Sequence, residues 1–246
     1  FSSVRYLLYG AAPMSVDKLK EAIGFFGPIM MGGYGQTEAP ASIAFLRPEE
    51  HFRNGRGKAL AADARLKSVG RPSPFIQVEI MDEENRMLKT GETGEICVRG
   101  DLLMKGYYKN PEQTAKTIID GWLHTGDIGH IDDDGYLYIT DRKKDMIITG
   151  GFNVYPQTVE QVIWSHPAVQ DCAVIGVPDE DWGEAVKAVV EVKPGQTIDV
   201  EEIKALCKEK LGSVKSPKTV DIIKELPRSS VGKVLKKDLK RLYLDH

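Results

Sequence analysis

The sequence predicts a chain of two different regions, an α/β segment that continues into antiparallel sheet and then a compact α+β unit. Three observations support this order. Residues 4–27 join an apolar strand-like run to a capped helical pattern, and residues 68–100 alternate strand-like runs with Gly, Asn and Asp turns. From Met146 onward, strands and helices are mixed over roughly a hundred residues, near the usual size of a domain.

The first element is VRYLLYG (4–10), whose apolar run predicts a buried strand. SVDKLKEAIGFFG (15–27) predicts a helix with Ser15 as its N-cap and Gly27 as its terminator. PIMMGGYGQTE (28–38) predicts a second strand that runs into a glycine-rich turn. The strand–helix–strand order favours a portion of a parallel sheet.

The character of the sequence changes near Ser68, where short strand-like runs and turn residues predict antiparallel sheet. GHIDDDGYLYIT (129–140) predicts a hairpin with its turn at Asp134-Gly135. Its DDDG run lacks the alternating spacing of a calcium-binding loop, so the turn explains it better.

The last region begins with a helix predicted at TVEQVIWSHPAV (158–169), followed by the strands CAVIGVPD and AVKAVVEVK. DVEEIKALCKEKLG (199–212) has apolar residues at Ile203, Leu206 and Leu211 flanked by charge, which predicts an amphipathic helix. The remaining segment predicts a strand, a polar loop and a final helix.

Composition excludes some classes of protein. Net charge is −3, from 33 Lys+Arg and 36 Asp+Glu, so no global basic field recruits nucleic acid. From Lys204 to His246, 12 Lys/Arg face 5 Asp/Glu, which indicates either a solvated basic face or a docking surface for a polyphosphate. Neither a signal peptide nor a membrane-spanning run is evident. The chain opens directly in a strand without Met, so we expect a piece of a longer protein.

The three cysteines form neither a paired framework nor a metal-binding pattern. Their odd number and wide spacing favour a reduced, cytoplasmic compartment.

GGYGQTEAP (32–40) is the first candidate site. Glycines let backbone approach a ligand closely, Thr37 can donate a hydroxyl to phosphate, and Glu38 is a hard oxygen ligand suited to Mg²⁺. The alternative is a tight turn that ends a strand.

DGWLHTGDIG (120–129) is the second candidate site. Asp127, flanked by glycines after a strand-like run, could accept both hydroxyls of a ribose, or could simply be a turn residue. His124 is better explained as a packed histidine than as a catalyst.

Two further candidates lie beyond residue 138. YITDRKKDMIITGGFNVYP (138–156) interrupts strand-like runs with five charges, among them Arg142, whose planar fork suits ribose or phosphate oxygens. Gly150-Gly151 could let an extended ligand lie against backbone, although a plain hairpin with a charged turn is the alternative.

LPRSSVGK (226–233) presents Lys233 on a polar, flexible loop, but its spacing does not match a P-loop.

In combination and order, YGQTE, WLHTGD, GYLYITDRKKDMIITGGFNVYP and LPRSSVGK resemble the adenylate-forming superfamily, which includes acyl- and aryl-CoA synthetases, luciferases and peptide-synthetase adenylation domains. The resemblance runs from Tyr9-Gly10-Ala11-Ala12-Pro13 to Lys233, essentially the whole chain. It implies the C-terminal portion of a large domain at 1–141, made of a parallel-sheet α/β region (residues 1–67) and an antiparallel β-barrel region (residues 68–141). A hinge at 142–145 and a small mobile α+β domain at 146–246 would follow.

The resemblance implies a carboxylate–CoA ligase that uses ATP, Mg²⁺ and coenzyme A to make an acyl-adenylate and then a thioester. Lys233, Glu38 and Thr37 would be catalytic, with Glu38 holding Mg²⁺ and Lys144 acting as the hinge. The CoA-facing residues would be Gly150, Gly151 and Phe152. The ATP- or AMP-binding residues would be Gly10, Ala11, Ala12, Tyr34, Gly35, Thr37, Asp127, Arg142 and Lys233.

Two departures from the family pattern affect these expectations. Ile148 stands where plant coumarate ligases and luciferases carry a second lysine, which favours bacterial-type acyl-CoA synthetases. The family's Ser/Thr/Gly-rich phosphate loop is absent from the 246 residues, so we expect this chain alone to be inactive in adenylation. The acid would be fatty or aromatic. An adenylation domain of another enzyme of this superfamily and a non-catalytic nucleotide-binding module are the alternatives.

Overall fold

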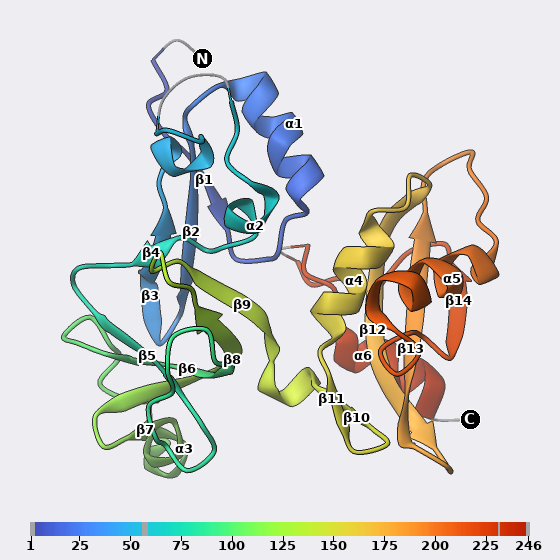
Figure 1. Ribbon diagram of the computed structural model, residues 1–246. Helices are drawn as coiled ribbons and strands as arrows, with labels where there is room; N and C mark the ends of the chain where they lie inside the picture. The colour runs from blue at the N-terminus through green and yellow to red at the C-terminus, as the bar shows by residue number, and fades with distance from the viewer. Residues whose placement is uncertain (1–2, 56–58, 231, 245–246) are drawn as a thin grey trace. The chain divides into compact units, whose positions relative to one another are not determined.

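The computed structural model describes residues 3–55, 59–230 and 232–244 (Figure 1). The chain divides into two compact units, Phe1–Thr140 and Asp141–His246, and the division falls within strand β9 (Leu137–Arg142). Each unit has its own hydrophobic core. The hinge expected at 142–145 remains a prediction.

The first sheet has the strand order β1-β2-β3-β4. Its elements, with the short helices beside it, are β1 (Leu7–Gly10), α1 (Val16–Phe26), β2 (Met30–Gln36), β3 (Ala39–Leu46), η1 (Pro48–His51), α2 (Asp63–Leu66) and β4 (Arg71–Pro72). β1 pairs with β2 in parallel, with Leu7 opposite Met30. The predicted parallel strand–helix–strand unit is therefore confirmed, and β3 and β4 extend it antiparallel.

Helix α1 ends where its sequence predicts. The Ser15 hydroxyl accepts a hydrogen bond from the Lys18 amide at 3.3 Å, and Gly27 closes the helix with φ +80°. The buried face of α1, formed by Val16, Leu19 and Ile23, packs in a core that includes Met30 and Phe52. This packing fixes the carboxyl ends of β1 and β2 beside one another.

The second sheet of this unit has the order β5-β6-β8-β7, and β9 pairs with β8. Its elements are β5 (Gln77–Met81), β6 (Gly94–Arg99), α3 (Pro111–Thr117), β7 (Ile118–Ile119), β8 (Trp122–Ile131) and β9. The antiparallel prediction is confirmed, as is the hairpin between β8 and β9. At its turn the Gly135 amide bonds to the Asp132 carbonyl, and the Asp132 side chain accepts from Tyr136 and Tyr138.

The second unit is built on a five-stranded sheet of order β11-β10-β13-β12, with β14 added in parallel to β13. Its elements are η2 (Lys143–Asp145), β10 (Ile147–Thr149), β11 (Phe152–Val154), α4 (Pro156–Trp164), β12 (Val169–Asp179), β13 (Gly183–Val192), α5 (Val200–Leu211), β14 (Thr219–Ile223) and α6 (Lys236–Leu244). Successive residues of β12 enter two different cores: Cys172 and Val174 pack with α4 and α5, whereas Ala173 and Ile175 pack with Leu239 of α6.

The helix expected at 158–169 is placed differently. α4 begins at Pro156 and ends at Trp164, and β12 begins at Val169. Pro167 explains the early end, because a proline disfavours helical backbone at the residue before it. The helix predicted at 199–212 is confirmed as α5, capped by Asp199 and Gly212. None of the three cysteines forms a disulfide, and all are buried. Among the described residues, no helix is long and apolar enough to cross a membrane.

Candidate nucleotide site and the lysine loop

The carboxyl ends of the parallel strands β1 and β2 form the centre of the first candidate site. Gly10, Ala11 and Ala12 are exposed there, and Ala11 has φ +65°, a left-handed conformation that alanine rarely adopts. A Cβ on Gly10 would lie 2.3 Å from the Gly33 carbonyl oxygen, so β1 and β2 approach closely only because this residue is glycine. Ligands of α/β sheets bind outside the carboxyl ends of such strands.

Asp127 lies beside this edge, but it is not in a turn as its flanking glycines suggest. It belongs to β8, whose register against β6 shifts so that Thr125, Gly126 and Asp127 oppose the single residue Ile96. Gly126 enables this bulge with φ +70°. The Asp127 carboxylate is thereby turned toward β2 instead of continuing the alternation of the strand.

Two side chains of β2 hold the Asp127 carboxylate. The Tyr34 hydroxyl donates to Oδ2 at 2.6 Å, and the Gln36 amide donates to the same oxygen at 2.7 Å and to the Thr125 carbonyl at 2.9 Å. Asp127 is 2% exposed and Tyr34 is 7% exposed. Such short bonds to a carboxylate are charge-assisted and strong, so the acid group has a fixed orientation.

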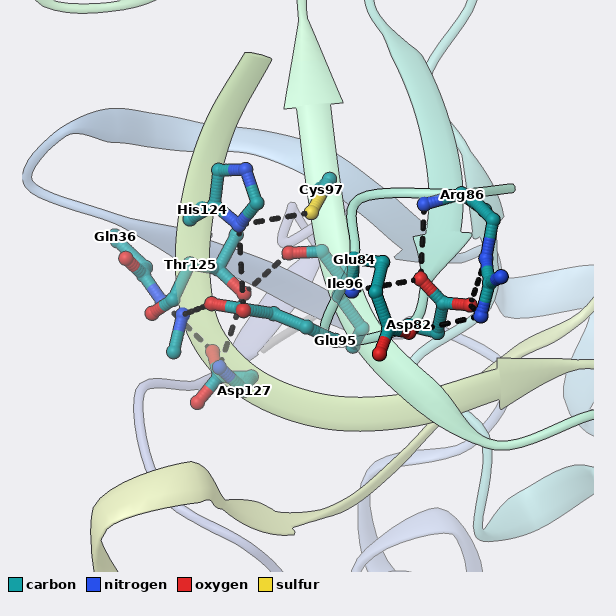
Figure 2. Close-up of polar contacts among 11 residues, drawn as sticks. Gln36, Asp82, Glu84, Arg86, Glu95, Ile96, Cys97, His124, Thr125 and Asp127 are labelled. Carbon is teal, nitrogen blue, oxygen red and sulfur yellow. Dashed lines mark hydrogen bonds and ion pairs between the residues drawn. The ribbon is translucent and has the colours of Figure 1, made fainter. Parts of the chain in front are cut away.

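Figure 2 shows the polar contacts around the bulge. The Glu95 carboxylate accepts from the Gly126 amide at 3.0 Å and lies 3.3 Å from Nδ1 of His124. The Thr125 hydroxyl donates to the Ile96 carbonyl at 2.7 Å and accepts from the Asp127 amide at 3.0 Å. His124, with Cys97 3.5 Å from its ring nitrogen, is a packed histidine as predicted.

Thr37 and Glu38 form the two-residue connection between β2 and β3, where Gln36 pairs with Ala39. The segment is thus a tight turn, and the same turn exposes the Thr37 side chain to solvent, where it could bind a ligand. The Glu38 carboxylate accepts from the Tyr107 hydroxyl at 2.7 Å, and its backbone carbonyl accepts from Met104. Gly35 precedes the turn at the register shift between β2 and β3.

A magnesium role for Glu38 fits the chemistry of its surroundings. Within the described ranges, three or more His, Cys, Asp or Glu side chains nowhere gather as a metal site. Mg²⁺ commonly takes only one or two carboxylates and completes its octahedron with substrate phosphates and water. A single half-buried carboxylate at the turn is compatible with that mode of binding.

The remaining candidates lie in the second unit. Asp141 is 5% exposed, and its carboxylate accepts from the Arg142 amide at 2.7 Å and from the Gln157 amide at 2.6 Å. It thereby caps α4, whose own N-cap residue, Tyr155, makes no side-chain cap bond. Arg142 and Lys144 are exposed. The charged stretch 141–145 therefore leads from a helix cap into η2, and it is not a hairpin turn.

Gly150 and Gly151 form the turn between β10 and β11, with φ of +55° and +80°. The Gly150 amide donates to the Trp182 carbonyl at 2.9 Å, and a Cβ on Gly150 would lie 2.4 Å from the Trp182 ring. Phe152 is 57% exposed. The two glycines therefore form the turn of this hairpin, whereas the five charges lie before it, in and beside η2, so the alternative of a hairpin with a charged turn is wrong.

The loop that carries Lys233 is more closed than its polar sequence suggests. The Ser229 amide bonds to the Lys233 carbonyl at 2.8 Å, the Lys233 amide bonds to the Ser229 hydroxyl at 3.2 Å, and Arg228 forms a β-bridge with Val234. Lys233 itself is exposed. The described portion of this loop is thus a short hairpin that projects one lysine.

The structure assembles some of the predicted site residues within each unit. In the first unit it brings Tyr34, Asp127 and the Gly10–Ala12 edge together, with Thr37 and Glu38 at the end of β2. Arg142, Lys144, Lys233 and the Gly150–Phe152 turn belong to the second unit. Gln36 and Glu95 are not identified by the sequence patterns. Gln36 stands inside the YGQTE motif and could have been found there, whereas Glu95 carries no local signal.

Comparison with known proteins identifies the family to which this mixed α/β fold belongs. The family model described as AMP-binding enzyme matches residues 1–108, and the one described as AMP-binding enzyme C-terminal domain matches residues 158–233. The chain belongs to this family of adenylate-forming enzymes, and its relatives include acyl- and aryl-CoA synthetases.

Three similar proteins illustrate the range of enzymes that the comparisons match. A medium/long-chain-fatty-acid–CoA ligase, FadD8 of Mycobacterium tuberculosis, is 46% identical over 96% of this chain and 41% of its own length. A feruloyl-CoA synthase of an Amycolatopsis species is 40% identical over 98% of this chain and 47% of its own length. The amide bond synthetase McbA of Marinactinospora thermotolerans superposes with a TM-score of 0.90 at 40% identity, over 98% of this chain and 48% of that one. The chain thus spans less than half the length of these relatives.

Proposed function

We propose that this chain belongs to an ATP-dependent carboxylate–CoA ligase. The observation that carries the proposal is the Asp127 carboxylate, fixed by Tyr34 and Gln36 beside the exposed, strained backbone of Gly10–Ala12. An ordered carboxylate suits the two hydroxyls of a ribose. A bare backbone edge at the carboxyl ends of parallel strands suits the flat base beside it. The family models for AMP-binding enzymes support the same ligand.

In the proposed first reaction, a carboxylate oxygen of the acid attacks the α-phosphorus of ATP. A P–O bond to the acid forms, the bond to the β-phosphate bridge breaks, and pyrophosphate leaves. Thr37 binds phosphate through its exposed hydroxyl, Arg142 adds donors to the ribose, and Gly35 lets the turn approach the ligand. Glu38 would hold Mg²⁺, which would neutralise phosphate charge when bound.

Lys233 supplies positive charge where the phosphoryl oxygens become more negative in the transition state. A donor of this kind is typically worth about 10²–10³ in rate. In the proposed second reaction, the thiol sulfur of coenzyme A attacks the acyl carbon, AMP leaves with the bonding electrons, and the thiol proton passes to solvent. The turn at Gly150, Gly151 and Phe152 would line the path of the thiol arm, after rotation at Lys144.

For the acid we propose a fatty or an aromatic carboxylic acid, as in the relatives named above. A second candidate is favoured by the similarity to the amide bond synthetase: the same adenylate could be transferred to an amine instead of a thiol. We place the protein in the cytoplasm, where ATP and coenzyme A are available.

The proposal is tested with the complete open reading frame that encodes these residues. Purified enzyme is incubated with ATP, Mg²⁺ and a panel of fatty and aromatic acids, with coenzyme A or an amine as acceptor, and products are identified by mass spectrometry. We expect AMP and an acyl-CoA with one class of acid. Amide formation in preference to thioester would support the second candidate. Failure to form any adenylate across the panel, with ATP binding intact, would favour a non-catalytic nucleotide-binding module.

The same assay on the 246-residue chain addresses the missing phosphate loop. The sequence contains no Ser/Thr/Gly-rich loop ending in Pro-Lys, so we propose that these residues alone bind AMP but do not form the adenylate. Adenylate formation by this chain would contradict that element of the proposal.

A further inference from the structure

Both ends of the Lys233 loop are tied to acidic side chains of the second unit. On the entering side, Arg228 lies 2.8 Å from Asp171 and 3.2 Å from Glu191. On the leaving side, Lys236 is the first residue of α6, and its Nζ lies 2.7 Å from Oε1 of Glu160 in α4. The loop between these two basic residues carries the one lysine to which the proposed function assigns adenylation.

The tie at Lys236 is the more buried of the two. The Glu160 side chain is 8% exposed and that of Lys236 is 20% exposed, whereas the Arg228 side chain is 30% exposed. Glu160 also accepts from the Val174 amide at 2.8 Å, which fixes its carboxylate to β12. Helix α4, strand β12 and the start of α6 therefore meet at one ion pair.

A second carboxylate adds to the field around Lys236. Burial alone would lower the pKa of Lys236, but the Glu160 and Asp141 carboxylates raise it, so the ammonium stays charged. Asp141 is held in turn by the Arg142 and Gln157 amides. The cluster Asp141–Lys236–Glu160 thus connects the segment that holds Arg142 to the loop that holds Lys233.

Burying the charges of this cluster has a desolvation cost that offsets much of the stability gained from their attraction. A well-packed apolar pair of similar volume often stabilises a protein as much as a buried ion pair or more. An ion pair with fixed hydrogen bonds does define the register of one helix end against another. Lys233 is exposed and lies only three positions before Lys236. The position of the Lys233 backbone therefore depends on how the start of α6 is held against α4.

Building on the proposed ligase function, we propose that Lys236 is a positioning residue for adenylation, whose ion pair with Glu160 fixes the Lys233 loop. Displacing a catalytic group by about 1 Å can cost about 10²-fold in rate. The second half-reaction should not depend on Lys236. Its proposed surface, the turn at Gly150 and Gly151, is held instead by the Trp182 carbonyl and by pairing of Thr149 with Gly183.

The kinetic experiment uses the complete open reading frame and measures each half-reaction separately. ATP–pyrophosphate exchange reports adenylation, and thioester formation from a synthetic acyl-adenylate reports the second step. Lys236→Met should lower the kcat of exchange by about tenfold to hundredfold and leave thioester formation within about twofold. Lys236→Arg should retain most of the exchange rate. Lys237→Met, a change at an exposed neighbour, is the matched control and should leave both rates unchanged.

A merely structural role is tested with the double variant Glu160→Gln/Lys236→Met, which removes both charges of the ion pair. The Asp141 carboxylate keeps its hydrogen bonds from the Arg142 and Gln157 amides in this variant. We expect this variant to fold stably and still to exchange slowly. Normal exchange by the double variant would overturn the proposal, as would an equal loss of both half-reactions in Lys236→Met.

A second readout does not need activity. Amide hydrogen exchange of the 246-residue chain should quicken in residues 228–230 and 232–235 of the double variant, and not in the Gly150 turn. Unchanged protection of the loop would refute the positioning role even if the wild-type enzyme is active. Conversely, faster loop exchange in the variant, together with a wild-type enzyme that forms no adenylate, would refute the proposed function while the tie between Lys236 and the loop stands.

Discussion

The bond between Tyr34 and Asp127 gives the sharpest prediction from the structure. Tyr34→Phe removes one oxygen atom and preserves the ring that packs in the core. The lost bond is 2.6 Å long and ends on a carboxylate that is 2% exposed, so water cannot readily replace it. A hydrogen bond to a charged group is worth about 1.5–3 kcal/mol. The free energy of unfolding of the first unit should fall by about that amount.

The matched control is Tyr107→Phe, which removes a bond of 2.7 Å to the Glu38 carboxylate. Glu38 is only half-buried, so water can take the place of the hydroxyl and the loss should stay below about 1 kcal/mol. Urea unfolding of the 246-residue chain is followed by Trp122 fluorescence, in a background where Trp164 and Trp182 are phenylalanine. Equal losses in the two variants, or less than about 0.5 kcal/mol for Tyr34→Phe, would refute the assignment of a buried, strongly bonded Asp127.

Three further predictions concern other regions of the molecule. Gly150→Ala should destabilise the second unit more than Gly151→Ala, measured by urea unfolding, because only the first Cβ meets the Trp182 ring; Trp182→Ala should reduce the difference. Burial lowers the pKa of His51 below its ordinary value of 6.5, so the unfolded chain binds a proton there more readily. The first unit should lose stability as pH falls below about 6.5, and His51→Gln should flatten that dependence in thermal unfolding. Glu95→Gln should loosen the bulge at Gly126, cost about 1–2 kcal/mol of stability and weaken AMP binding by calorimetry; unchanged AMP affinity would exclude a role for the bulge in the site.

Local signals predict much of the fold. The cap residues Ser15 and Gly27 and the apolar run before them indicate a parallel strand–helix–strand unit, because each signal acts within a few residues. The hairpin at Asp134-Gly135 and the helix α5 follow from similar local chemistry. The predicted end of α4 is too late because the apolar pattern continues to Val169. Pro167 disfavours helical backbone before that point.

The candidate site depends more on contacts between distant residues. The two flanking glycines predict a turn at Asp127, but its orientation comes from Tyr34 and Gln36, 93 and 91 positions away. The pairing of Lys236 with Glu160 is likewise not predicted from the sequence, since the two residues belong to different helices that are far apart in the chain. Sequence motifs name most candidate groups, and only tertiary structure shows what holds them in place.

ATP–pyrophosphate exchange by the complete open reading frame tests the central claim most directly, because it isolates formation of the adenylate. We expect exchange that depends on one class of carboxylic acid and that falls by about 10²–10³ in Lys233→Ala, with ATP affinity nearly unchanged. Exchange that persists in Lys233→Ala, or that is absent with every acid while ATP still binds, would contradict the assignment of this chain to an adenylate-forming ligase reaction.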